Sequence, residues 1–212
     1  MSSTASFLRP ALAFGAAILM AACSANYVTV PPRMDLKPYG RVALVTFTAD
    51  DPSSPLSARA SERFVERMLE SQYGIEIIEL DARAPELGGL DPATHPAELA
   101  KALGKRRAEI PAVFVGHLGL SDVQPSGGLA GVGDFQMRAS VSASLRVQLL
   151  STGTGGTLWR GSAQGERTVG SMEMSGGRPS VSLRDVDEVW DEVLNDLVWQ
   201  ATWDFRPTRA KQ

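Results

Sequence analysis

The sequence is poor in the residue types that metal, disulfide and nucleic-acid chemistry require. Its 212 residues include one cysteine and two histidines. A lone thiol excludes an internal disulfide, and two histidines outside any H-E-x-x-H spacing leave little material for a zinc site. The 21 lysines and arginines are outnumbered by 24 acidic side chains, so the chain lacks the basic surface that nucleic acid attracts. We expect no metal, no cofactor and no nucleic-acid partner.

Catalytic constellations are scarce as well. His95 precedes a proline that can start a helix, and His117 ends a predicted strand, where open α/β sheets often bind ligands. A hydrogen-bonded strand-end histidine is the simpler explanation of His117. Asp50 and Asp51 follow the first strand without a partner base, which favours a solvated turn. The glycine-rich run 127–133 opens a strand instead of the helix that a phosphate loop needs, which favours a hairpin tip. We expect no catalytic residues. A hydrolase or ligand-binding enzyme therefore ranks third among the possible functions, after an interaction module and a channel subunit.

The one cysteine, Cys23, follows a short apolar run. Arg9 supplies a positive n-region, and residues 11–22 carry no charge, which suits the apolar core of an export signal and is short for a membrane span. The run ends in Met20, Ala21 and Ala22, which resembles the bacterial lipobox, although leucine is usual at the position of Met20. We therefore predict a lipoprotein signal peptide at 1–22 and lipidation of Cys23 by acyl chains such as palmitate. The alternative is an ordinary signal peptide that leaves Cys23 as a free thiol.

Acylation implies a location. Two or three acyl chains bury many methylenes at about 0.8 kcal/mol each, so they anchor a protein without a spanning helix. In lipoproteins of two-membraned bacteria, the residue after the cysteine helps to sort the product, and Ser24 is compatible with transfer to the outer membrane. We expect a protein on the periplasmic face of that membrane. Residues 23–39 contain three prolines and no sustained periodicity, which predicts a lipidated tether of at most about 55 Å.

The rest of the chain has the composition of one ordinary globular domain, with 43% hydrophobic and 21% charged residues. We place this domain at 40–206 and a tail at 207–212. Loss of residues 1–22 removes Arg9 alone among charged side chains, so the formal net charge goes from −3 to −4. Short apolar runs and three-to-four-residue periods predict a strand at 41–47, a helix at 57–73, a strand at 75–80, a helix at 96–103 and a strand at 112–118. Gly74 and Gly104 stand where the two helices should end.

A long hairpin is the clearest pattern in the sequence. Apolar residues occupy every odd position from 135 to 149 and polar residues every even one, which predicts a one-sided strand with its odd face against the helices. Residues 151–156 form a turn, and the segment from Thr157 returns antiparallel with Trp159 on one side. The segments 119–134 and 168–182 are expected to be loops.

The last predicted element is an amphipathic helix at 183–203. Its apolar face comprises Val186, Val189, Trp190, Val193, Leu194, Leu197 and Ala201. At 100° per residue, Trp199 lies about 180° and Trp203 about 220° from Trp190, on the outer face. Trp199, Trp203 and the nearby Phe205 are therefore candidates for anchoring a partner or a second subunit. The alternative is that a neighbouring segment of the tether covers the two tryptophans.

These features together resemble a known family. An acylated cysteine, the order β-α-β-α-β, a hairpin with "LRVQLLSTGTGGTLWRGSAQGE" and a terminal helix that ends in "WDFRP" are similar to the CsgG/LpoB/TolB-N-terminal-like group of periplasmic lipoproteins. The resemblance covers residues 40–206 and involves no catalytic motif. It implies an α/β (α+β) fold with a small mixed sheet in the order β-α-β-α-β-β-β-α. Members of this group are interaction or assembly proteins.

The resemblance leaves the function open between three roles. We expect a non-catalytic interaction or assembly module that binds envelope proteins, either as single copies or as a homo-oligomer. A subunit of an oligomeric outer-membrane secretion channel is an alternative, but the segment 119–134 has a central proline and scattered apolar residues, which suit insertion poorly. A second alternative is an activator of a cell-wall synthase. Such an activator needs a long tether to reach a partner at the inner membrane, and this tether is too short.

Overall fold

The computed structural model describes residues 27–121, 123–131, 134–175 and 178–211. These residues form two units. Residues 32–206, hereafter the body, are one unit, and the two chain ends pair with each other in the second. The predicted signal segment 1–22 and Cys23 lie outside the described residues.

The second unit is a short antiparallel pair of strands. β1 (Tyr27–Val30) pairs with β10 (Thr208–Lys211), so that Val28 lies opposite Ala210. No strand was predicted in the tether or the tail, and each contains one of these strands. A four-residue strand gives almost no periodicity, and its partner lies at the other end of the sequence.

The body begins before the predicted boundary at residue 40. Leu36 is fully buried, and its N–H donates to Gln72 Oε1 at 2.8 Å. Gln72 is itself buried, and its Nε2 donates to the carbonyl oxygens of Met34, at 3.3 Å, and Phe205, at 2.6 Å. One glutamine therefore ties the start of the body to its end.

The predicted elements of the body occur in the predicted order, and further strands and 3-10 helices lie between or next to them. The elements are η1 (Lys37–Tyr39), β2 (Arg41–Val45), β3 (Thr48–Ala49), α2 (Leu56–Ser71), β4 (Glu76–Leu80), η2 (Pro85–Leu87), α3 (Pro96–Arg106), β5 (Ala112–Leu120), β6 (Gln124–Gly131), β7 (Asp134–Ser151), β8 (Thr157–Ser175), β9 (Arg178–Leu183), α4 (Val186–Ala201) and η3 (Trp203–Phe205). The strands form one mixed sheet in the order β4-β2-β5-β7-β8-β9, with β3 on β5 and β6 on β7. β2 is parallel to β4 and β5, and β7 is antiparallel to β5, β6 and β8. The predicted α+β class with a mixed sheet is confirmed.

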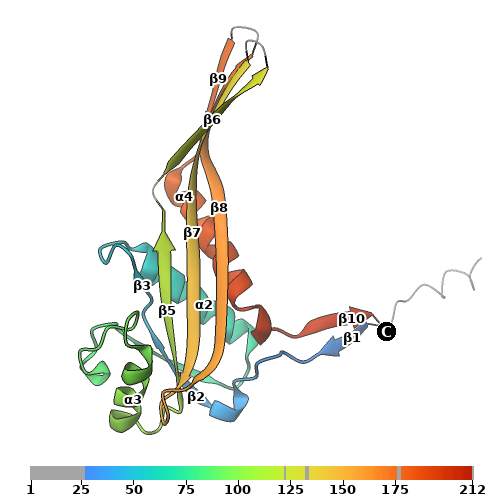
Figure 1. The fold of residues 1–212 in the computed structure, drawn as a ribbon. Coiled ribbons are helices and arrows are strands. Elements are labelled where there is room, and N and C mark those ends of the chain that lie inside the picture. The colour runs from blue at the N-terminus through green and yellow to red at the C-terminus, as the bar shows by residue number, and fades with distance from the viewer. Residues whose placement is uncertain (1–26, 122, 132–133, 176–177, 212) are drawn as a thin grey trace, which may run out of the picture. The chain divides into compact units, whose positions relative to one another are not determined.

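Apolar side chains on the two faces of this sheet form two cores. The larger core joins α2 and α4 to the face that carries Phe114 and Leu145, and the smaller core joins α3 to the face that carries Val113 and Leu150. The alternation of Val113 and Phe114 between the cores is the two-residue period of a strand that is buried on both faces. Figure 1 shows α4 lying along β7 and β8, with both strands continuing past the start of the helix.

The predicted hairpin is confirmed, and so is the inward odd face of β7 over most of its length. Every odd residue from Val141 to Leu149 is buried in the larger core. Trp159 on β8 packs against Phe114, with ring centroids 6.3 Å apart, and its Nε1 donates to Asp204 Oδ2 at 3.1 Å. Met137 departs from the prediction because it lies beyond the helices and is 42% exposed.

The helix ends differ from the prediction by up to three residues, and two of these differences have a clear structural cause. α3 continues past Gly104 to Arg106, because Gly104 is a packing position instead of a stop signal: a Cβ there would lie 2.4 Å from the Thr152 carbonyl oxygen. α4 begins at Val186, where Asp185 caps the helix by accepting the N–H of Asp187 at 2.8 Å. Val186 was predicted to be buried and is 49% exposed.

Candidate functional site

A four-stranded antiparallel ribbon continues the sheet beyond the helices. It consists of β6, residues 134–140 of β7, residues 168–175 of β8, and β9, and we call it the ribbon. β6 pairs with one edge of β7, β8 with the other, and β9 with the far edge of β8. Two hairpins therefore lie side by side at this end of the sheet (Figure 1).

One face of the ribbon is apolar. Met137 on β7 lies opposite Gly127 on β6 and Met172 on β8, and Met172 lies opposite Val181 on β9. Residues that face each other across strands project from the same side of a sheet. Val181 is 62% exposed and Met137 42% exposed, so this row is open to solvent.

A second apolar row follows. Ala139 lies opposite Gly170, and Gly170 lies opposite Leu183. Leu183 is 82% exposed, although a Cβ on Gly170 would lie 3.0 Å from its Cδ2. The leucine thus leans over the glycine and stays largely in water. The apolar face of the ribbon continues the face that α4 covers further down β7, but no described helix covers it here.

The opposite face of the ribbon is polar. In the intervening rows, Gln136 lies opposite Glu173, and Arg138 lies opposite Ser171. Gln136 Nε2 donates to Glu173 Oε1. β9 presents Ser180 and Ser182 in the same two rows, and both are exposed. The ribbon therefore has one apolar face and one polar face.

The prediction that 119–134 and 168–182 are loops is wrong. Pro125 lies within β6, which is an edge strand, and an edge strand tolerates proline because the missing N–H leaves no neighbouring strand without a hydrogen bond. The signal that could have revealed the second hairpin is its alternation, because "SMEMS" and "PSVSL" place apolar residues at every second position.

The tryptophans of α4 and η3 lie on the surface, as the helical angle predicts. Trp199 is 46% and Trp203 50% exposed. The guanidinium carbon of Arg206 lies 3.4 Å from the Trp199 ring centroid and that of Arg67 lies 5.0 Å from it. Arg206 Nη2 also donates to the Trp199 carbonyl oxygen at 2.7 Å. Burial, and to a lesser extent the nearby Arg67, lower the pKa of Arg206 to about 10. We call Arg67, Trp199, Trp203 and Arg206 the tryptophan patch.

Phe205 does not belong to this surface, although it was grouped with the two tryptophans. Its side chain is fully buried, and its ring meets Trp159 at 4.6 Å and Phe114 at 5.8 Å between centroids. The chain turns inward through η3, and the ring closes the end of the larger core. A partner cannot reach Phe205 without opening that core.

The strand-end histidine is hydrogen-bonded, as the simpler explanation predicts. His117 Nε2 lies 3.0 Å from Asp50 Oδ1, and His117 Nδ1 lies 3.0 Å from Thr48 Oγ1. Asp50 Oδ2 also accepts the Leu120 N–H at 3.2 Å. The bond from His117, and then that from Leu120, lower the pKa of Asp50. These contacts fasten the loop after β3 to β5.

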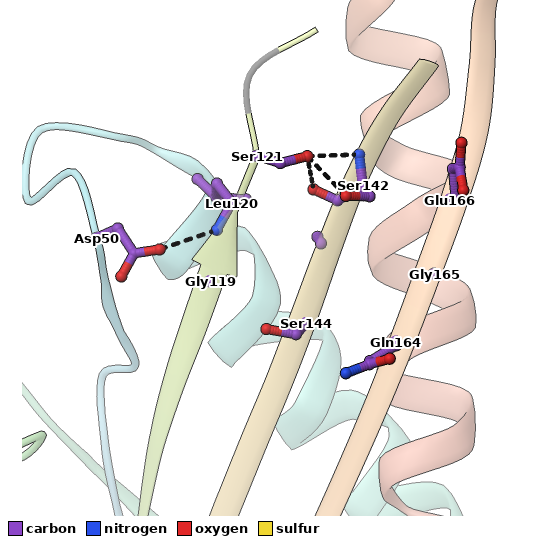
Figure 2. Close-up of a pocket in the computed structure, with 10 residues that line it drawn as sticks. Asp50, Gly119, Leu120, Ser121, Ser142, Ser144, Gln164, Gly165 and Glu166 are labelled. Atoms are coloured by element: carbon purple, nitrogen blue, oxygen red, sulfur yellow. Dashed lines mark hydrogen bonds between the residues drawn. The ribbon is translucent and has the colours of Figure 1, made fainter. Parts of the chain in front are cut away.

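Asp50 also borders a polar cleft of about 600 Å³ between β5, β7 and β8 (Figure 2). Ser121 Oγ and Ser142 Oγ lie 2.6 Å apart, and Ser121 Oγ accepts the Ser142 N–H at 3.1 Å. Neither hydroxyl bonds to a histidine or a carboxylate in the part of the chain that the structure describes. The two serines hold the junction between β5 and β6 against β7.

The remaining polar candidates have local bonds. Asp51 accepts both the N–H of Ser53, at 2.9 Å, and its hydroxyl, at 2.7 Å, as in the predicted turn, and these bonds lower the pKa of Asp51. His95 is the N-cap residue of α3, and its Nδ1 lies 2.8 Å from Thr94 Oγ1. No three His, Cys, Asp or Glu side chains are grouped to hold a metal ion within the described ranges. None of the helices described above is long and apolar enough to cross a membrane.

Comparisons with known proteins found similarity in solved structures. No family model and no curated protein matches the sequence. A PelC dodecamer from Paraburkholderia phytofirmans is 13% identical at a TM-score of 0.41, over 85% of this chain and 96% of that chain. Lipoprotein GNA1162 from Neisseria meningitidis is 16% identical at a TM-score of 0.40, over 61% of this chain and 83% of that chain.

The LpoB C-terminal domain from Salmonella enterica is 15% identical at a TM-score of 0.35, over 70% of this chain and 90% of that chain. The similar structures therefore include a lipoprotein and an LpoB domain.

Proposed function

We propose that the chain is a lipid-anchored, non-catalytic assembly module on the periplasmic face of the outer membrane, and that it binds another envelope protein through the apolar face of the ribbon. The observation that carries this proposal is the apolar row of Met137, Met172 and Val181 on a sheet face without a described cover. Exposed apolar surface of this kind marks a binding site, because burying it is favourable by roughly 25 cal/mol per Å².

The anchor supports the same function. Acyl chains on Cys23 would hold the module at the membrane, with Ser24 permitting transfer to the outer membrane. The body starts at Pro32, which leaves few residues between the lipid and the fold. A tether this short disfavours the role of a synthase activator that reaches a partner at the opposite membrane.

In-cell photocrosslinking tests the proposal. A photoreactive residue at Val181 samples the apolar face, and one at the adjacent Ser180 samples the polar face of the same strand as a matched control. We expect a discrete envelope protein to crosslink from Val181 and not from Ser180. Equal crosslinking from both positions, or none from Val181, would contradict the proposal.

A second candidate is a subunit of an oligomeric outer-membrane secretion channel. The observation that favours it is the pair of adjacent hairpins with a shared apolar face, which could contact lipid. Its difficulty is length, because β9 has 6 residues and β6 has 8, whereas a spanning strand needs about 9–11. Crosslinks from Val181 to lipid, together with self-crosslinks that form a ladder of multimers, would favour the channel over the module.

A further inference from the structure

We infer that the end of the body formed by the last turn of α4 and η3 rests on a phospholipid surface, with the tryptophan patch in the headgroup region. This inference rests on the lipid anchor of the proposed function. It assigns the two exposed tryptophans to the membrane and leaves the apolar face of the ribbon for the protein partner.

The tryptophans fit a membrane surface by their chemistry. Trp199 and Trp203 each expose about half of their side chain. An indole has a large apolar ring and a polar N–H, so it is stable where acyl chains meet headgroups, with one part dry and the other hydrated. Two such rings within one turn at the end of a helix form a small interfacial contact.

An exposed arginine beside these rings supplies donors for phosphate, and two others hold Trp199 in place. Arg206 lies over Trp199 and positions this ring, because its Nη2 donates to the Trp199 carbonyl oxygen at 2.7 Å while its Nε and Nη1 are buried. The guanidinium carbon of Arg67 lies 5.0 Å from the centroid of the same ring, and its Nη1 pairs with Glu70 Oε2 at 2.7 Å. Arg33 lies 3.5 Å from Asp204 in η3, and its side chain is 82% exposed. Guanidinium groups bind phosphate through planar pairs of N–H donors, which suits lipid headgroups.

The length of the chain keeps this end of the body near the anchor. The N–H of Met34 donates to the Asp204 carbonyl oxygen at 3.0 Å, directly beside Trp203. The eleven residue steps from Cys23 to Met34 span at most about 40 Å when fully extended. A lipid on Cys23 therefore holds Trp203 within reach of the bilayer.

The ribbon lies toward the other end of β8. The end of α4 packs next to Gly161, since a Cβ there would lie 2.8 Å from the Ala201 carbonyl oxygen. From Gly161 to Met172 on the same strand are eleven residue steps, or roughly 36 Å at about 3.3 Å each. A membrane at the tryptophan patch and a protein at the ribbon can consequently be bound at the same time.

Quenching by brominated lipid tests this contact. The chain from residue 23 onward has one thiol, so Cys23 can be coupled to a maleimide lipid in phosphatidylcholine vesicles, whether or not cells acylate it. We expect brominated phosphatidylcholine to quench a large part of the tryptophan emission. The variant Trp199→Phe/Trp203→Phe should lose most of this quenching, because Trp159 and Trp190 are at least partly buried. Absence of quenching in the unmodified sequence would overturn the inference.

A relocated tryptophan provides the matched control. Val181→Trp, made in the double variant, places an indole on the apolar face of the ribbon, and we expect it to escape quenching. Quenching at this position would show that the ribbon enters the lipid, which refutes the orientation and favours the channel. Crosslinking of the tryptophan patch to an envelope protein in cells, without quenching in vesicles, would assign the patch to a protein.

Metabolic labelling with a fatty acid separately tests the anchor: label that persists in Cys23→Ala would refute the anchor of the proposed function and leave the vesicle result intact.

Discussion

Replacement of Phe205 by alanine tests whether this ring belongs to the core or to a binding surface. The side chain is fully buried, and its ring makes edge-to-face contacts with Trp159, at 67°, and with Phe114, at 71°. A Phe→Ala change in such a site removes the transfer free energy of the ring and leaves a cavity, which together cost about 3–5 kcal/mol. The bonds of Gln72 to the backbone of this segment persist, because they do not involve the ring.

This cost translates into a large thermal shift. For a body that spans residues 32–206, 1 kcal/mol corresponds to roughly 2–4 °C in Tm, so Phe205→Ala should lower Tm by about 6–20 °C. Urea unfolding followed by circular dichroism measures the loss of free energy directly. An unchanged m value would show that the variant unfolds from the same compact state.

Trp203→Ala is the matched control, since this residue lies two positions earlier and is 50% exposed. We expect it to cost less than about 1 kcal/mol, in line with other surface substitutions. If Phe205→Ala proves no more destabilising than Trp203→Ala, then Phe205 does not close the core, and its original assignment to the surface would stand.

Three further substitutions test the fold and the site. Val141→Asp should lower the free energy of unfolding by several kcal/mol in urea titrations, because Val141 is 1% exposed, whereas Ser142→Asp should be much milder; equal losses would show that the register of β7 is wrong. Gly104→Ala should lower Tm, although alanine normally stabilises a helix by about 1 kcal/mol over glycine, because the new methyl would meet the Thr152 carbonyl oxygen at 2.4 Å; a raised Tm would contradict this packing. Asp50→Asn should be less stable than the unmodified protein at pH 7, because a carboxyl whose pKa is lowered below 3.8 on folding stabilises the fold only while it is ionised. This difference in stability should disappear as the pH falls through the folded-state pKa of Asp50, and a difference that persists in acid would exclude the ionised carboxylate as its cause.

The sequence contains the long hairpin and the order of helices and strands, because their signals lie within short windows. The alternation from Val141 to Leu149 specifies a strand with one buried face, and the spacing of Ala60, Phe64 and Met68 specifies a helix with one buried stripe. His117 could also be anticipated as a hydrogen-bonded residue from its place at the end of a strand, although its partners Thr48 and Asp50 could be identified only in three dimensions.

Only part of the candidate site could be predicted from the sequence. The helical angle places Trp199 and Trp203 on the outer face of α4, and both are exposed. The apolar row of the ribbon was missed, since β6 and β9 are edge strands whose conformation depends on hydrogen bonds to β7 and β8. The alternation in β8 and β9 was present in the sequence, but it is short, and only the pairing with β7 makes it part of a sheet.

The sequence by itself thus determined the elements whose periodicity matches the faces they bury. The tertiary structure decided which apolar residues are covered. Phe205 and Trp203 are neighbouring aromatic residues, yet Phe205 is buried because Phe114 and Trp159 converge on it from distant strands, while Trp203 has half of its surface in water. Burial is a property of contacts between remote segments, and no local window of sequence contains those contacts.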